Sequence, residues 1–228
     1  AEDCVKLARL SVPLGRYFCA SWGARGTPVT EFHLDTGDHP LAKRMTKGED
    51  VSPFVVRPAR RWLKYDVEKL YRPSRPEFFE NPKLLVRKVT GSRGLVVAVD
   101  ESGLYTDDSL ACVVRKSELA SIPTAQRKKH GLEIYNFEIE PSRAYDLHLV
   151  AALLQTPLVQ TYYRVQLGGG LNVFPSLIEA LPLPKPDALE KPEAARLALL
   201  GRACAHGAAF DMAEADRLAR VLFGFDEG

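Results

Sequence analysis

The spacing of hydrophobic positions in this chain changes about two thirds of the way along it. The first part carries short apolar runs, the clearest being KLLVRKV and GLVVAVD, joined by TGSR, and LACVVR after the turn DESGLYTDDS. Enrichment in Val and Leu, with turn residues at both ends, predicts strands here. Residues 12–35 predict a hairpin that turns at GARGTP, and LEIYNFEIE alternates apolar and polar residues as a strand does.

Beyond residue 143 the pattern predicts helices. AYDLHLVAALLQ is the first, and a second begins at Thr156-Pro157, with Thr as N-cap and Pro at the first helical position, and ends at Gly168. KPEAARLALLGRACAHGAA follows, and DMAEADRLARVLFGF is capped by Asp211 with Glu214 three residues on.

Strands first and helices last predict an α+β fold. We expect a strand-rich mixed sheet with basic loops, followed by a helical C-terminal part. Residues 1–185 would form one domain, and residues 186–228 a helical tail packed on it.

Composition is that of an ordinary globular protein, with 46% hydrophobic and 26% charged residues among 228. No apolar run approaches the ~20 residues that a membrane span needs. We therefore expect no membrane partner. The four cysteines are far apart and predict reduced, mostly buried thiols in a cytoplasmic protein; they are Cys4, Cys19, Cys112 and Cys204. The N-terminus has no initiator Met and resembles a cut inside a longer polypeptide.

The net charge of +2 hides an asymmetry along the chain. Residues 41–130 carry 19 Lys and Arg against 11 Asp and Glu, whereas both flanks are slightly acidic. Concentrated positive charge is what a polyanionic partner requires, because neutralised phosphates release counterions. A solvated basic surface without a partner is the alternative.

The run LGGGLNVFPSLIEALPLPKP raises the question of a phosphate-binding loop. A P-loop needs a strand before the glycines and Lys-Ser/Thr after them, and here a helix precedes and Leu171-Asn172 follows. The dinucleotide fingerprint fails for the same reason. We interpret 168–172 as a flexible corner near a nucleic acid, with Asn172 as a polar contact and a purely structural helix C-cap as the rival interpretation. The polar turn between His33 and His39 fits no standard metal site, and no catalytic motif is found, so we predict no catalytic residue and no metal.

Several segments, in order, resemble one known domain. They are LGRYFCASWGARGTPVTEFHL, KGEDVSPFVVRPARRWLKYD, FFENPKLLVRKVTGSRGLVVAVDESGLYTDDSLACVV, LHLVAALLQTPLVQTYYRVQLGGG and FPSLIEALPLPKP. Together they are similar to the TaqI-like C-terminal specificity (target recognition) domain of adenine-specific DNA methyltransferases and fused restriction–modification enzymes. Each motif is weak alone, and their order and spacing carry the resemblance.

The resemblance implies that this chain binds double-stranded DNA and positions a target adenine. A catalytic methyltransferase domain of the same polypeptide, absent here, would bind S-adenosylmethionine and methylate the flipped base. We therefore expect no cofactor in this chain and leave open whether it is part of an enzyme and whether an endonuclease is fused. The alternatives are a protein–protein docking module with acidic C-terminal helices and the recognition domain of a nuclease-free phage-defence methyltransferase.

Candidate DNA-binding residues come from the basic middle region and the glycine run. Arg suits guanine edges and Lys suits phosphate. Four candidates precede the first central strands, three flank the TGSR turn and one follows the glycines: Lys47, Arg57, Arg60, Arg61, Arg87, Lys88, Arg93 and Asn172. We assign Trp22 and Trp62 to the core rather than to base stacking.

Overall fold

The computed structural model describes residues 2–25, 32–57, 60–71, 74–90, 94–129 and 131–225. Its strands are β1 Val12–Pro13, β2 Phe18–Trp22, β3 His33–Leu34, β4 Ala42–Thr46, β5 Val51–Ser52, β6 Val55–Val56, β7 Trp62–Lys64, β8 Lys83–Arg87, β9 Val97–Asp100, β10 Tyr105–Thr106, β11 Leu110–Arg115 and β12 Pro182–Leu183. Its helices are α1 Glu2–Leu10, α2 Glu77–Glu80, α3 Thr124–Lys129, α4 Asn136–Arg143, α5 Leu147–Gln155, α6 Pro157–Gln166, α7 Pro175–Glu179, α8 Pro192–Ala205 and α9 Met212–Leu222. Short 3-10 turns lie at η1 Leu14–Arg16, η3 Gly48–Asp50 and η5 Pro186–Glu190.

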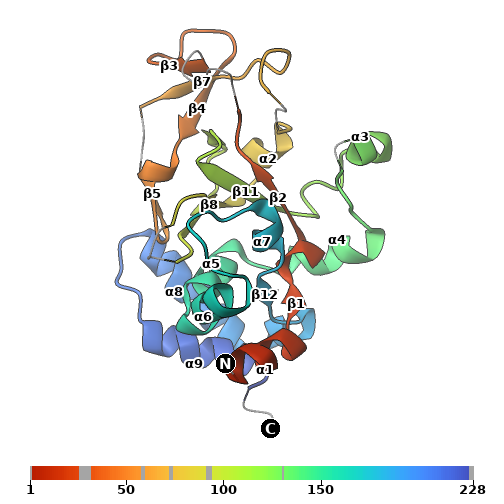
Figure 1. Cartoon of the computed structure of the whole chain (residues 1–228), viewed down its shortest axis with the longest axis vertical. Coiled ribbons are helices and arrows are strands. Elements are labelled where there is room, and N and C mark those ends of the chain that lie inside the picture. Colours follow the sequence, from red (N-terminus) through yellow and green to blue (C-terminus); the bar gives the residue numbers. More distant parts are fainter. Residues whose placement is uncertain are drawn as a thin grey trace.

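A four-stranded antiparallel sheet, in the order β2-β11-β8-β9, forms the middle of the molecule (Figure 1). Successive side chains of a strand point to opposite faces of a sheet. Leu84 and Val86 of β8 accordingly join the core on the helical side, whereas Leu85 joins a second core on the other side. Burial on both faces explains why the middle of the strand, residues 84–86, is apolar without interruption.

A second four-stranded sheet, in the order β10-β4-β7-β3, lies at one end of the molecule, and most helices gather at the other end (Figure 1). β10 runs parallel to β4, while the other pairs are antiparallel. Several sheets followed by a helical C-terminal part confirm the predicted α+β class.

The C-terminal helices begin where their caps predict. The Thr156 hydroxyl accepts a hydrogen bond from the Val159 N–H, and the Asp211 carboxylate accepts one from the Glu214 N–H. α8 packs closely on α5, since a Cβ at Gly201 would lie 2.3 Å from the carbonyl oxygen of His148. The tail therefore shares its apolar core with the helices before it. A domain boundary at residue 185 stays a prediction.

Two predicted elements are wrong. The hairpin over residues 12–35 does not form among the described residues, because β2 pairs with β11 while β3 pairs with β7. The alternating run 132–140 leads into helix α4 instead of a strand. Glu138 explains this helix: its carboxylate accepts the Tyr135 N–H at the helix start and forms a buried ion pair with Lys116, with 2.7 Å between Nζ and Oε2. A tertiary contact has overridden the local pattern.

All four cysteines are buried and unpaired, as predicted. Among the described helices, none is both long and apolar enough to cross a membrane.

Candidate nucleic-acid interface

Three basic side chains converge on two adjacent carboxylates. Lys47 Nζ lies 3.8 Å from Asp107 Oδ2, while Lys88 Nζ and Arg25 Nε lie 3.2 and 3.4 Å from Asp108 Oδ2. We call Arg25, Lys47 and Lys88 the cation cluster. Its members come from the ends of β2, β4 and β8 and retain between a quarter and two fifths of their exposure. The cluster keeps one excess positive charge and stays accessible to an anion.

The turn that carries the two carboxylates is fixed by its own hydrogen bonds. The Ser109 N–H donates to Asp107 Oδ1 at 3.0 Å, and the Ser109 hydroxyl accepts the Gly48 N–H at 2.8 Å. The Ser109 carbonyl accepts the Lys88 N–H at 2.9 Å. These bonds join the turn to the strand ends that carry Lys47 and Lys88. The cation cluster therefore sits on a rigid backbone.

Trp22 lies under two of these cations. Lys88 Nζ is 5.0 Å and the Arg25 guanidinium carbon 5.6 Å from the indole ring, within the range of cation–π attraction. The Phe174 ring meets the indole edge-on, with 6.2 Å between centroids. Trp22 is partly buried and packs against the core, to which it was assigned. The indole ring therefore lies between the core and the two cations, Lys88 and Arg25, and stabilises them at the surface.

The glycine corner, residues 168–174, lies beside the same strand end. Gly168 has φ of +73° directly after α6, which is the conformation of a helix C-cap glycine. Asn172 then forms a bridge with Val89, next to Lys88. The structure thus brings Asn172 and Lys88 together, although they are 84 residues apart in the sequence.

The remaining sequence candidates lie in different settings. Arg61 is ion-paired with Glu49 and Asp50, at 2.7 and 3.4 Å, and this hydrogen-bonded pairing with Glu49 raises the pKa of its guanidinium. Arg57 and Arg60 are exposed on the connection from β6 to β7.

Arg87 and Arg93 complete the set of candidates. Arg87 follows the alternation of β8 onto the face of Leu85, opposite the face on which Val86 lies. It is half-buried and shows no ion pair with the described part of the chain. Arg93 lies outside the described residues. Whether these residues contact DNA stays a prediction.

His33 borders the cation cluster. Its Nδ1 lies 3.3 Å from Lys47 Nζ. Burial, together with the positive charge of Lys47, lowers the pKa of His33 below its ordinary value. The imidazole is therefore neutral at pH 7 and adds no charge to the cluster. No group of three or more His, Cys, Asp or Glu side chains able to hold a metal occurs in the described ranges.

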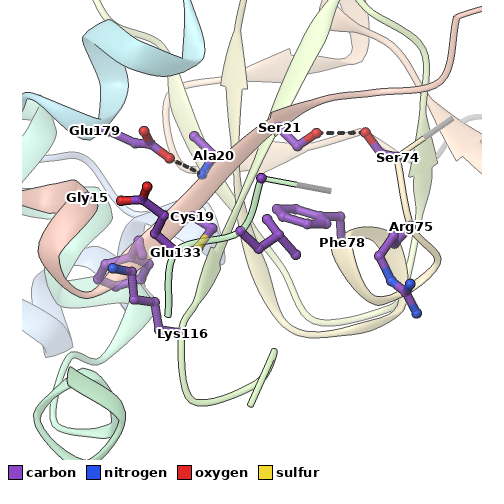
Figure 2. Close-up of a pocket in the computed structure, with 13 residues that line it drawn as sticks. Gly15, Cys19, Ala20, Ser21, Ser74, Arg75, Phe78, Lys116, Glu133 and Glu179 are labelled. Carbon is purple, nitrogen blue, oxygen red and sulfur yellow. Dashed lines mark hydrogen bonds between the residues drawn. The ribbon is translucent and has the colours of Figure 1, made fainter. Parts of the chain in front are cut away.

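A pocket of about 750 Å³ opens along the outer edge of β2 (Figure 2). The Glu179 carboxylate, on α7, accepts the Ala20 N–H at 2.9 Å, and the Ser21 and Ser74 hydroxyls are 2.7 Å apart. Ser74 also donates to the Trp22 carbonyl. Glu179 and Ser74 thus form hydrogen bonds with backbone groups on the outer edge of β2. Such bonds are expected at the edge of a sheet that avoids pairing with another chain.

The polar groups of this pocket do not form a reactive centre. Burial raises the pKa of the Cys19 thiol to about 12, so the nucleophilic thiolate is scarce at neutral pH. Burial also raises the pKa of Glu179, although the Ala20 N–H opposes the shift. Lys116 points its ammonium to Glu138. The basic surface at the cation cluster remains the stronger candidate site.

One family model matches the middle of the chain. Residues 43–128 match the family of TaqI-like C-terminal specificity domains. The predicted resemblance is confirmed over this segment. It contains Lys47, Lys88 and the Asp107–Asp108 turn, whereas Arg25 and Asn172 lie outside it. A specificity domain supports a role in DNA recognition. No curated protein matches the chain.

Two solved structures match the chain at low similarity. One, from work on complex assembly and conformational transition of the type I R-M system, is 14% identical with a TM-score of 0.46, covering 93% of this chain and 44% of the other. The second, the HsdS subunit from Thermoanaerobacter tengcongensis, is 13% identical with a TM-score of 0.45, covering 99% and 49%. The chain spans about half the length of the solved structures that it matches.

Sequence reasoning missed Arg25 and the carboxylates that hold the cluster. Arg25 lies at the end of β2, and Asp107 and Asp108 precede β11, so their meeting depends on the pairing of these two strands. A period-two pattern does not name the partner of a strand. The sequence contained the residues but no signal for their contact.

Proposed function

We propose that this chain is a DNA sequence-recognition unit of a restriction–modification system, and that the cation cluster and the glycine corner face the duplex. The convergence of Arg25, Lys47 and Lys88 on the partly buried Asp107–Asp108 turn carries the proposal, because three strand ends place partly exposed positive charge at one surface. Lys and Arg at such a surface neutralise phosphates and release counterions. The match to a specificity domain supports the same role.

The finer proposal concerns the enzyme that this unit serves. A methyltransferase domain or subunit would bind S-adenosylmethionine and act on an adenine within the recognised sequence. The described residues of this chain would then bind the duplex and fix the position of the protein along it. The catalytic partner would carry out the methylation. Fusion in one polypeptide, and fusion to an endonuclease, are further parts of this proposal.

Selection from a pool of duplexes with randomised central positions tests the proposal. The intact protein is mixed with the pool at moderate salt, and the bound fraction is sequenced. We expect enrichment of a short motif that includes an adenine. A bound fraction as random as the starting pool, or no bound fraction at all, would contradict sequence recognition. Enrichment of a motif without adenine would contradict only the finer proposal.

A further inference from the structure

The glycine corner exposes large apolar side chains although its backbone is tied down. Leu171 is 62% exposed and Phe174 49% exposed, whereas Val173 between them is fully buried. Apolar side chains that gather at the surface beside polar groups mark interaction sites on soluble proteins. At the glycine corner they stand on a hydrogen-bonded backbone.

Four hydrogen bonds hold the backbone of the glycine corner. The Thr90 N–H donates to the Leu171 carbonyl at 3.2 Å, and the Val173 N–H donates to the Lys88 carbonyl at 2.8 Å. On the other side, the Gly169 N–H donates to the Tyr163 carbonyl at 3.2 Å. The Tyr163 hydroxyl reaches the Gly170 carbonyl at 3.4 Å. The corner is therefore presented as a fixed edge, with its two apolar side chains in solvent.

Positive charge surrounds this edge. Lys88 lies one residue before the Val89–Asn172 bridge, and Arg164 is exposed on the last turn of α6, against the glycines. A Cβ at Gly169 would lie 2.7 Å from the Arg164 Cα, so the corner packs directly on that turn. Phe174 also touches Trp22, the ring that carries Lys88 and Arg25. The apolar edge and the cation cluster form one continuous surface, and α7 follows the corner to lie along β2 (Figure 1).

We propose that Leu171 and Phe174 form an apolar wedge that enters the DNA duplex and partly unstacks a base step beside the recognised sequence. This inference rests on the proposed function. Proteins that kink DNA insert Phe or Leu side chains between base pairs while flanking cations hold the phosphates. A rigid backbone suits this role, because unstacking costs a few kcal/mol per step and a mobile loop would lose further entropy on ordering.

Duplex DNA fits this surface better than a protein partner does. Three basic side chains, Lys88, Arg25 and Arg164, lie beside the two apolar ones, and one carboxylate, Asp108, is shared between two of them. The cores of protein interfaces are depleted in charge, whereas DNA interfaces are strongly positive. Charge complementarity therefore selects the duplex.

Fluorescence of 2-aminopurine, placed at successive positions of the selected duplex, tests the wedge in the intact protein. The wild-type protein should raise the fluorescence at one step at least about threefold, because unstacking relieves quenching. The double variant Leu171→Ala/Phe174→Ala should lose most of this rise. Its salt dependence of binding should stay unchanged, because the cation cluster is intact. Leu199→Ala, at a 59% exposed residue of α8, is the matched control and should behave as wild type.

The results that would contradict the wedge alone differ from the result that would contradict DNA recognition as well. Binding by the wild-type protein without any rise, or an undiminished rise in the double variant, would overturn the wedge and leave DNA recognition intact. Loss of association with a methyltransferase subunit, with an undiminished rise, would also overturn it and assign this surface to protein docking. No binding by the wild-type protein would overturn both proposals. Thermal unfolding of each variant separates these outcomes from loss of the fold.

Discussion

Two lysines near opposite ends of β8 show how differently one strand uses the same side chain. Lys83 is fully buried, and its ammonium lies 2.5 Å from Asp100 Oδ2 and also donates to the Phe79 carbonyl. Lys88, just beyond the other end, is partly exposed and shares Asp108 with Arg25. A buried ion pair must satisfy both charges internally, whereas a partly exposed one can exchange its carboxylate for a phosphate. The first lysine serves the fold, and the second is available to a ligand.

The largest effect on stability is expected at Lys83, at the buried end of β8. Lys83→Met leaves the Asp100 carboxylate unpaired in the core, and removing one partner of a buried pair costs about 3–5 kcal/mol. Urea unfolding followed by circular dichroism measures this loss. The double variant Lys83→Met/Asp100→Leu should recover part of it, although Asp100 also accepts the Ser102 and Leu104 N–H groups. A loss below about 1 kcal/mol in the single variant would show that Lys83 is not the buried, paired residue described here.

A smaller loss is expected at the glycine corner. Gly168→Ala places a side chain at φ of +73° and should cost about 1–2 kcal/mol in the free energy of unfolding. Gly170→Ala is the matched control: its φ is not in the left-handed region, and the added Cβ would meet only the Gly168 carbonyl oxygen, at 3.7 Å. Equal stability of the two variants in urea would contradict the C-cap described for α6.

A gain in DNA affinity is expected when Asp108, the carboxylate that pairs with Lys88 beyond the end of β8, loses its charge. Asp108→Asn frees Lys88 and Arg25, and should raise affinity for duplex DNA about two- to fivefold at low salt, since exposed ion pairs are worth up to about 1 kcal/mol. Fluorescence anisotropy measures the affinity. Glu140→Gln, which breaks the exposed pair with Arg143, should leave it unchanged. A lower affinity in Asp108→Asn would mean that the carboxylate itself contacts the DNA.

The smallest effect is a pH dependence. His33 has a lowered pKa in the folded state, so the unfolded chain binds its proton first as the pH falls. The stability that the neutral imidazole contributes is complete above about pH 6.5, the ordinary pKa, and is lost as the pH falls below it. Urea unfolding at pH 7 and pH 5.5 should therefore show a larger loss for the wild-type protein than for His33→Gln. An equal loss would remove His33 as the cause.

Local chemistry was readable from the sequence, and long-range pairing was not. The caps at Thr156 and Asp211 involve residues three positions apart, and both were predicted. Strand β2 was recognised as a strand but given the wrong partner, because β11 lies some 90 residues away. Lys88 was predicted as a candidate from its place beside the TGSR turn in the basic middle region, yet Arg25 and Asp108 join it only through that distant pairing. The family resemblance supplied a role that no single motif carried.

The salt dependence of DNA binding by Lys88→Ala tests the central claim most directly. Affinity of the intact protein is measured between about 50 and 200 mM salt, with Arg217→Ala, at an exposed residue of α9 on the helical side, as the matched control. We predict that Lys88→Ala weakens binding to all sequences alike and reduces the slope of log affinity against log salt by about 1. The control should keep the wild-type slope. An unchanged slope in Lys88→Ala, or an equal reduction in Arg217→Ala, would contradict a DNA interface at the cation cluster.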